Sequence, residues 1–277
     1  MSRRFLTLVL LIPLVSRTTT YAEEPIEAIS EVRGAGVTVD ELRQKLIEPR
    51  TFSAHVDGHW VATTRQDEPL QSWNNPTRLN TAGATYLWTH DGRPAVISCV
   101  FDIKTSGNKI LLTHEIHALL DLPLRGEDSG GEFWHPNQTL TLTRLTEAPE
   151  LNDDARKRIT QYKQIARQFT AKLLRFQTQE NYQLRVLPQP LYSWSNQTGV
   201  EGHLFCIAEG TDPEVILLLE SRPDESNNRQ IFYGLARMTI GRVRVQRHGT
   251  DLWDVPELDP RQYSDPNRAY TTIQVPR

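Results

Sequence analysis

The chain has 277 residues, a formal net charge of −3 at pH 7, two cysteines and 38% hydrophobic residues. This length allows one large domain or two small ones, each with a buried core. The mildly acidic charge excludes a general electrostatic attraction to nucleic acid, so we predict no nucleic-acid partner.

Residues 1–22 are predicted to be a secretory signal peptide. Arg3 and Arg4 provide its positive charge, Phe5 to Val15 is its apolar stretch, and Ala22 ends a typical cleavage sequence. The alternative is an uncleaved membrane anchor, but the apolar stretch is shorter than the about 20 residues that cross a bilayer. After cleavage we expect no integral membrane span. The predicted location is outside the cytoplasm, either periplasmic or extracellular.

Residues 23–50 are predicted to be a lead-in followed by a short helix. Thr38 is the expected N-cap, and Glu41 three residues later completes a capping box. Pro49 is expected to end this helix.

Residues 51–150 are predicted to form an N-terminal antiparallel β region. Two apolar runs, residues 84–89 and 95–101, flank the dipeptide Asp91-Gly92, which favours a β-hairpin. In this prediction Arg93 and Pro94 lengthen the hairpin loop.

Residues 151–178 are predicted to be one long basic amphipathic helix, spanning Asn152 to Gln177. Its apolar residues recur at three- and four-residue spacing. They are Ile159, Tyr162, Ile165, Ala166, Phe169, Leu173 and Phe176. The basic residues are expected on the solvated outer face. The alternative is a contact between this basic helix and an anionic surface, such as a polysaccharide or lipid headgroups.

Residues 179–256 are predicted to form a C-terminal antiparallel β meander, with residues 257–277 as a peripheral tail. The strand Val215–Leu219 is apolar throughout, so both of its faces should be covered. Further strands are expected at residues 183–187, 191–194, 203–208, 230–238, 242–247 and 252–255. The predicted fold class is α+β and β-rich, with antiparallel meander sheets packed against the long helix.

Two stretches of the chain are alike, Gly83 to Leu119 and Gly202 to Met238. Each contains a strand, a turn with Asp and Pro, an apolar strand, a longer loop and another strand. An internal repeat would explain this order. The alternative is that any two antiparallel meanders look similar at this level.

The sequence His114-Glu115-Ile116-His117 lacks the spacing of a zinc peptidase motif, because its histidines are three residues apart instead of four. On a strand, His114 and His117 would point to opposite faces. We therefore predict no metal and no cofactor. Five other residues, His55, Asp57, His59, His90 and His135, have no spacing that defines a site.

Cys99 and Cys206 lie within apolar strand patterns. Export would permit a disulfide between them, but buried free thiols are the preferred interpretation. Trp73 and Trp194 lie beside turns. They would either bind a sugar or a partner, or fill the end of a sheet, and the second role is the commoner one.

The chain resembles a family of exported proteins found in planctomycete bacteria. The resemblance lies in Leu184 to Tyr192 and Gly210 to Val215, with matching blocks at residues 75–78, 87–94 and 114–117. It covers most of the chain from Trp73 to Pro256. It implies a folded, exported domain, and it assigns no catalytic or binding residue.

The predicted function is an exported non-catalytic binding or structural module, because no motif has a spacing that a reaction requires. The alternative is an exported hydrolase whose site is assembled from distant residues around His114, Glu115 and His117. The sequence leaves open whether the protein is an enzyme.

Overall fold

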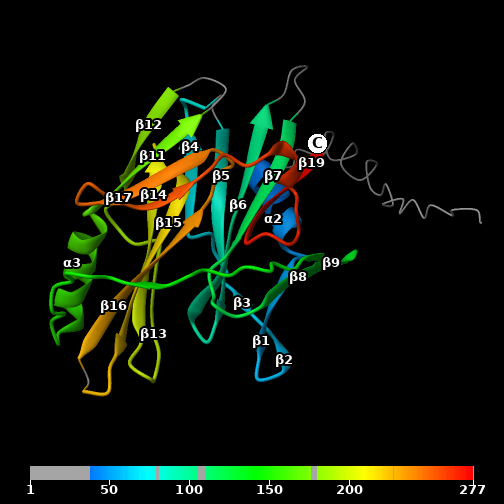
Figure 1. Cartoon of the computed structure of the whole chain (residues 1–277). Coiled ribbons are helices and arrows are strands. Elements are labelled where there is room, and N and C mark those ends of the chain that lie inside the picture. The colour runs from blue at the N-terminus through cyan, green and yellow to red at the C-terminus, as the bar shows by residue number, and fades with distance from the viewer. Residues whose placement is uncertain (1–37, 79–80, 105–109, 176–179, 227, 277) are drawn as a thin grey trace, which may run out of the picture. The chain divides into compact units, whose positions relative to one another are not determined.

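The computed structural model describes residues 38–78, 81–104, 110–175, 180–226 and 228–276. The predicted signal peptide and lead-in lie outside these residues. Most of the described chain is β-strand, and every strand pairing within it is antiparallel (Figure 1). The predicted β-rich antiparallel architecture is confirmed.

The first half of the described chain, residues 38–145, consists of one helix followed by strands. Its elements are α2 (Val39–Ile47), β1 (Thr51–Val56), β2 (His59–Ala62), β3 (Thr64–Arg65), β4 (Gln71–Asn75), β5 (Thr81–His90), β6 (Arg93–Lys104), β7 (Ile110–Ala118), β8 (Leu124–Asp128), β9 (Gly131–Trp134) and β10 (Thr143–Arg144). The predicted capping box at Thr38 and Glu41 is present.

The second half, residues 152–276, repeats this plan. Its elements are α3 (Ala155–Ala166), β11 (Phe169–Arg175), β12 (Glu180–Val186), β13 (Tyr192–Ser195), β14 (Glu201–Glu209), β15 (Asp212–Pro223), β16 (Arg229–Arg237), β17 (Arg242–Arg247), β18 (Thr250–Val255), the short 3-10 helix η2 (Pro260–Gln262) and β19 (Tyr270–Pro276). All the strands predicted between residues 183 and 255 are found.

The strands form three sheets. A four-stranded sheet has the order β2-β1-β8-β9, and a six-stranded sheet has the order β19-β7-β6-β5-β3, with β4 also paired to β5. A nine-stranded sheet has the order β10-β16-β15-β14-β12-β11-β17-β18, with β13 also paired to β14. The unbroken strand β12 joins β11 to β14. The corresponding stretch of the first half is divided into β2 and β3, which belong to different sheets.

The two halves share the order of their strands, and they also share the register in which equivalent strands pair. The β5–β6 pairing shifts between Trp88 and Thr89, one step before the pair formed by Pro94. The β14–β15 pairing shifts at the equivalent place, between Ile207 and Ala208, one step before the pair formed by Pro213. The predicted likeness of the two stretches therefore extends to individual residue pairs. The likeness also extends beyond Gly83 to Leu119 and Gly202 to Met238, because the order of elements corresponds over the whole of both halves.

The last strand of each half pairs with the other half. Strand β10 follows β9 in the chain but pairs with β16. Strand β19 follows β18 but pairs with β7, beside which it lies in Figure 1. This is a reciprocal exchange of terminal strands between the two halves.

The six-stranded and nine-stranded sheets meet in a shared apolar core. Equivalent residues of the two halves occupy it, as shown by Ile97 with Ile216 and Trp73 with Trp194. Two hydrogen bonds between the halves also correspond to each other. The Gln71 amide donates to the Thr211 carbonyl (3.4 Å), and the equivalent residue Tyr192 donates from its hydroxyl to the Gly92 carbonyl (3.1 Å). Two further cores lie around α3 and around α2 with the four-stranded sheet.

The prediction of one long basic helix is wrong. Helix α3 ends at Ala166, and strand β11 begins at Phe169. Phe169, Ala171 and Leu173 alternate inward as strand residues, but Phe169 and Leu173 also match helical spacing, which misled the prediction. The predicted basic surface is divided accordingly, because Lys172 and Arg175 lie on the strand and Arg158 is paired with Glu201.

Two smaller predictions are also corrected. Residues 257–277 are not a peripheral tail, because β19 completes the six-stranded sheet and Tyr270 is buried. A sequence with few apolar residues became a strand because the free edge of β7 was available to it. The β5–β6 loop contains only Asp91 and Gly92, both with positive φ, so Arg93 belongs to the strand.

Candidate functional site

Strand β7 separates the residues proposed for the hydrolase site. His114 and Ile116 point to one face, where Ile116 joins the core around α2. Glu115 and His117 lie on the opposite face. His114 is fully buried and lies 2.5 Å (Nε2) from the Ser98 hydroxyl, so neither group is accessible to a substrate. The three residues therefore do not form one catalytic site. In the described part of the chain, no group of three or more His, Cys, Asp or Glu residues is arranged to hold a metal ion.

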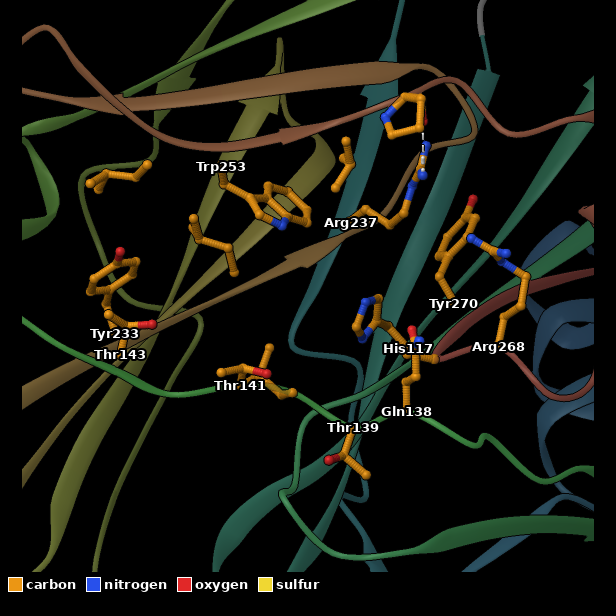
Figure 2. Close-up of a pocket in the computed structure, with 16 residues that line it drawn as sticks. His117, Gln138, Thr139, Thr141, Thr143, Tyr233, Arg237, Trp253, Arg268 and Tyr270 are labelled. Atoms are coloured by element: carbon orange, nitrogen blue, oxygen red, sulfur yellow. Dashed lines mark hydrogen bonds between the residues drawn. The ribbon is translucent and has the colours of Figure 1, made fainter.

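A cavity of about 470 Å³ lies beside His117, where the exchanged segments pass between the two halves (Figure 2). Strands β16 and β18 form one wall with Leu235 and Trp253. The end of β7 and the start of β19 form another wall with His117 and Tyr270. Residues 138–143, which lead to β10, complete the lining. This volume lies within the range of pockets that bind small molecules.

His117 presents a hydrogen-bond acceptor to this cavity. Its Nδ1 lies 2.7 Å from the Ala118 carbonyl, which can only accept, so Nδ1 carries the proton. Burial lowers the pKa of His117 to about 4. The ring is therefore neutral at pH 7. Its Nε2 has no hydrogen-bond partner among the described residues and has a lone pair for a ligand donor.

Two arginines, Arg237 and Arg268, also line the cavity. Arg237 is buried, and its guanidinium donates to the carbonyls of Thr239 (2.8 Å), Gly241 (2.7 Å) and Pro256 (3.1 Å). Neither arginine has a carboxylate oxygen within ion-pair distance among the described residues. The lining thus combines net positive charge with apolar and aromatic side chains.

Tyr270 forms the link between the cavity and the protein interior. Its ring lies 5.5 Å from the Arg237 guanidinium carbon, and its hydroxyl donates to Glu115 at 2.7 Å. Burial raises the pKa of Glu115 well above its usual range, and the hydrogen bond from Tyr270 opposes this only in part. Because this raised pKa favours the protonated form, Glu115 is a weak counter-ion for Arg237.

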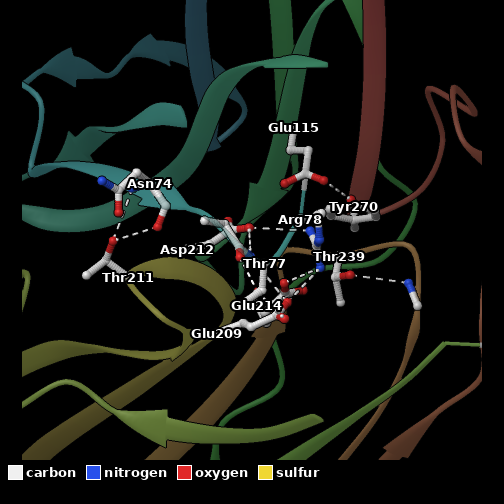
Figure 3. A network of polar contacts seen from close by, with 12 residues as sticks. Asn74, Thr77, Arg78, Glu115, Glu209, Thr211, Asp212, Glu214, Thr239 and Tyr270 are labelled. Carbon is white, nitrogen blue, oxygen red and sulfur yellow. Dashed lines mark hydrogen bonds and ion pairs between the residues drawn. The ribbon is translucent and has the colours of Figure 1, made fainter. Parts of the chain in front are cut away.

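Behind Tyr270 lies a buried network of charged groups (Figure 3). The Arg78 guanidinium pairs with three carboxylates at the β14–β15 hairpin, those of Glu209, Asp212 and Glu214. Burial alone would lower the pKa of Arg78, but the carboxylates raise it. The network joins the first half to the second half, and its charges are paired within the protein.

The remaining candidate residues occupy structural positions. His55 and His135 flank the ring of Trp60 at 5.1 and 5.6 Å between ring centroids, while His59 and Asp57 are exposed near the β1–β2 turn. His90 lies 3.6 Å from the carboxylate of Asp91 at the β5–β6 turn. These residues do not converge on one site.

Two cysteines and two tryptophans belong to the core between the halves. Cys99 and Cys206 are both buried, free thiols. Trp73 and Trp194 are buried and pack against Gly83 and Gly202. Both rings lie in the core that the two halves share, so neither is exposed to bind a sugar or a partner.

The sequence prediction did not include the cavity, because Trp253, Arg268 and Tyr270 come from distant segments. A usable signal was nevertheless present. Pro69-Leu70-Gln71-Ser72-Trp73 matches Pro190-Leu191-Tyr192-Ser193-Trp194, and Arg50 to Ala54 matches Arg167 to Ala171. These matches extend the repeat over both halves. They would have placed a strand where the long helix was predicted.

Comparisons with protein-family models, with curated proteins and with solved structures found no significant match. Among the described residues, no helix combines the length and apolar character that crossing a bilayer requires. The cavity beside His117 is therefore the feature of the described chain that best indicates a function.

Proposed function

We propose that this protein is an exported, non-catalytic binding module and that the cavity beside His117 receives a small ligand. The observation that supports this proposal most directly is the composition of the lining. Apolar side chains such as Leu235 and Trp253 line one part of the cavity, and polar side chains, among them those of His117, Arg237 and Arg268, line the rest. Ligand pockets commonly have this composition.

The alternative, a hydrolase around His114, Glu115 and His117, has less support. His114 lies on the far face of β7, and His117 has no serine, cysteine or threonine nucleophile hydrogen-bonded to it among the described residues. A nucleophile and its base must lie within hydrogen-bond reach of each other. Exposed Ser193 does contact His203 at 2.7 Å, but that ring packs against Tyr162, and no carboxylate hydrogen bond to it is seen in the described chain.

A neutral fluorescent probe, N-phenyl-1-naphthylamine, tests whether the cavity binds ligands. We expect saturable binding with one site per chain. The variant Thr141→Trp should lower the affinity at least tenfold, because Thr141 lines the cavity and is exposed enough to accept a larger side chain. The matched control is Val61→Trp on strand β2, which does not line the cavity.

Thermal unfolding should show that both variants remain folded. Binding that is not saturable, or that is equally strong in Thr141→Trp and the control, would contradict the proposal.

A further inference from the structure

We infer that the cavity selects a ligand with an acidic group on an apolar body, and that Arg268 and Arg237 bind the acidic group. This inference rests on the proposed function and specifies its ligand. It follows from the charge of the cavity lining and from the distribution of apolar side chains around it.

The first observation is positive charge without ion pairs. Two other partly buried guanidinium groups, those of Arg78 and Arg93, pair with carboxylates. Arg237 instead donates to three backbone carbonyls, which orient its guanidinium. Glu115 and Glu257 act on it electrostatically, but neither forms an ion pair with it among the described residues. A buried charge without a direct ion pair is costly, and an anionic ligand would reduce that cost.

The second observation is the position of Arg268. It lies two residues before Tyr270, the first residue of β19, and it lines the cavity together with that tyrosine. Arg237 and Arg268 line the same cavity, and the like charges of their guanidinium groups repel each other in the absence of an anion. A carboxylate or a similar acid can accept charge-assisted hydrogen bonds from such groups.

The third observation is the apolar wall on the β18 side. Leu252, Trp253 and Val255 line the cavity there, together with Leu235 and Tyr233 of β16. This wall can cover an aromatic ring or an aliphatic chain, since both gain free energy on leaving water. Charge at one side and apolar surface at the other define an amphipathic acid.

The test uses matched pairs of small molecules that differ only in charge. These are 2-naphthoate with 2-naphthamide, and octanoate with octanamide, each titrated calorimetrically into the full chain at pH 7. We expect at least one acid to bind tenfold or more tightly than its amide. The pair with the larger preference tells whether the apolar body is aromatic or aliphatic.

The side chain is tested with Arg268→Gln and Arg268→Lys. Gln should reduce the preference for the acid at least fivefold and leave amide binding unchanged, while Lys should retain most of the preference because it keeps the charge. The control is Arg261→Gln, at an arginine that pairs with Asp259 on the surface. Arg237 is left intact because its carbonyl contacts hold residues 239–241 and 256 in place.

Equal binding of acid and amide, or an equal loss of both in Arg268→Gln, would overturn the inference. If the neutral naphthylamine probe still binds in that case, the proposed binding function stands and only the ligand class is wrong. If the probe and all four compounds fail to bind, the binding function itself is wrong.

Discussion

The turns that follow β4 and β13 share one backbone hydrogen bond, from Arg78 to Asn75 in the first and from Gly199 to Asn196 in the second, each 3.2 Å long, but they differ in chemistry. In the first, the Thr77 hydroxyl donates to the Asn75 side chain at 2.7 Å; in the second, the Thr198 hydroxyl donates to the Asn196 side chain at 2.8 Å. The next residue is Arg78 in the first half and Gly199 in the second half.

The hairpins differ in the same way. The β14–β15 hairpin has Glu209, Asp212 and Glu214, and the equivalent places on the β5–β6 hairpin are His90, Arg93 and Ala95. Arg78 and its carboxylates therefore form a network at one end of the interface that the equivalent end does not reproduce. The apolar core keeps the two halves alike, while the charged residues at its ends have diverged.

The largest expected effect comes from removing the cation of this network. Arg78→Met should lower the free energy of unfolding at pH 7 by roughly 3–5 kcal/mol, because three buried carboxylates lose their shared guanidinium. Arg93→Met in the other half should cost less, about 1–2 kcal/mol. Its buried partner Glu220 keeps Arg222 at 2.6 Å.

Urea unfolding of the two variants measures this difference. The double variant Arg78→Met with Glu214→Leu should recover part of the lost stability. Equal losses in Arg78→Met and Arg93→Met would show that the two ends do not differ as described.

A smaller loss of stability is expected from substitutions that test whether the glycine–tryptophan packing is the same in both halves. Gly83→Ala would place a Cβ 2.4 Å from the Trp73 ring, and Gly202→Ala would place one 2.2 Å from the Trp194 ring. Each substitution should cost about 3 kcal/mol through overpacking. A second change, Trp73→Leu or Trp194→Leu in the matching alanine variant, should restore part of the stability measured by urea unfolding.

If only one of the two alanine variants is destabilised, the packing of the halves is not equivalent. A loss below about 1 kcal/mol in both would contradict the close approach of glycine and tryptophan.

The smallest effect concerns one buried histidine from each half, His117 and His203. Burial lowers the pKa of both to about 4 from a usual value of 6.5. Because the unfolded state binds the proton more tightly, each histidine favours folding above pH 6.5, and this contribution is lost as the pH falls toward 4. Between pH 7 and pH 5 the loss is about 2 kcal/mol for each residue.

The variants His117→Gln and His203→Gln should therefore show a smaller fall in unfolding free energy between pH 7 and pH 5 than the parent chain. The unfolding curves at the two pH values measure this difference directly. An unchanged pH dependence in either variant would mean that its histidine is not held neutral in the folded state.

Much of the fold was predictable because local rules and tertiary packing agree along most of the chain. The apolar run Val215–Leu219 lies inside its sheet, paired on both sides with β14 and β16, and the Asp91-Gly92 turn joins two strands. The exception is the stretch from Phe169 to Arg175. The spacing of its apolar residues fits both a helix and a strand. The stretch is a strand because it pairs with β12 on one side and with β17 on the other.

The candidate site was less predictable, since it depends on which distant segments meet. The sequence did draw attention to His117, but as part of a possible site with His114. On strand β7 the two histidines point to opposite faces, so they cannot form that site. Arg237, Trp253 and Tyr270 belong to no local motif. Their proximity follows from the crossing of the two terminal segments, which hydrophobic spacing does not encode.

The reciprocal exchange of β10 and β19 also bears on how the chain can be divided. Each half provides an edge strand to the sheet of the other half. Residues 38–145 and 152–276 are therefore not independent domains, because each needs a strand from the other to complete its sheet. Proteolytic nicking of the connection near residues 146–151 would leave two fragments held together without a covalent bond. Either fragment expressed alone would expose the strand edge that its missing counterpart normally covers.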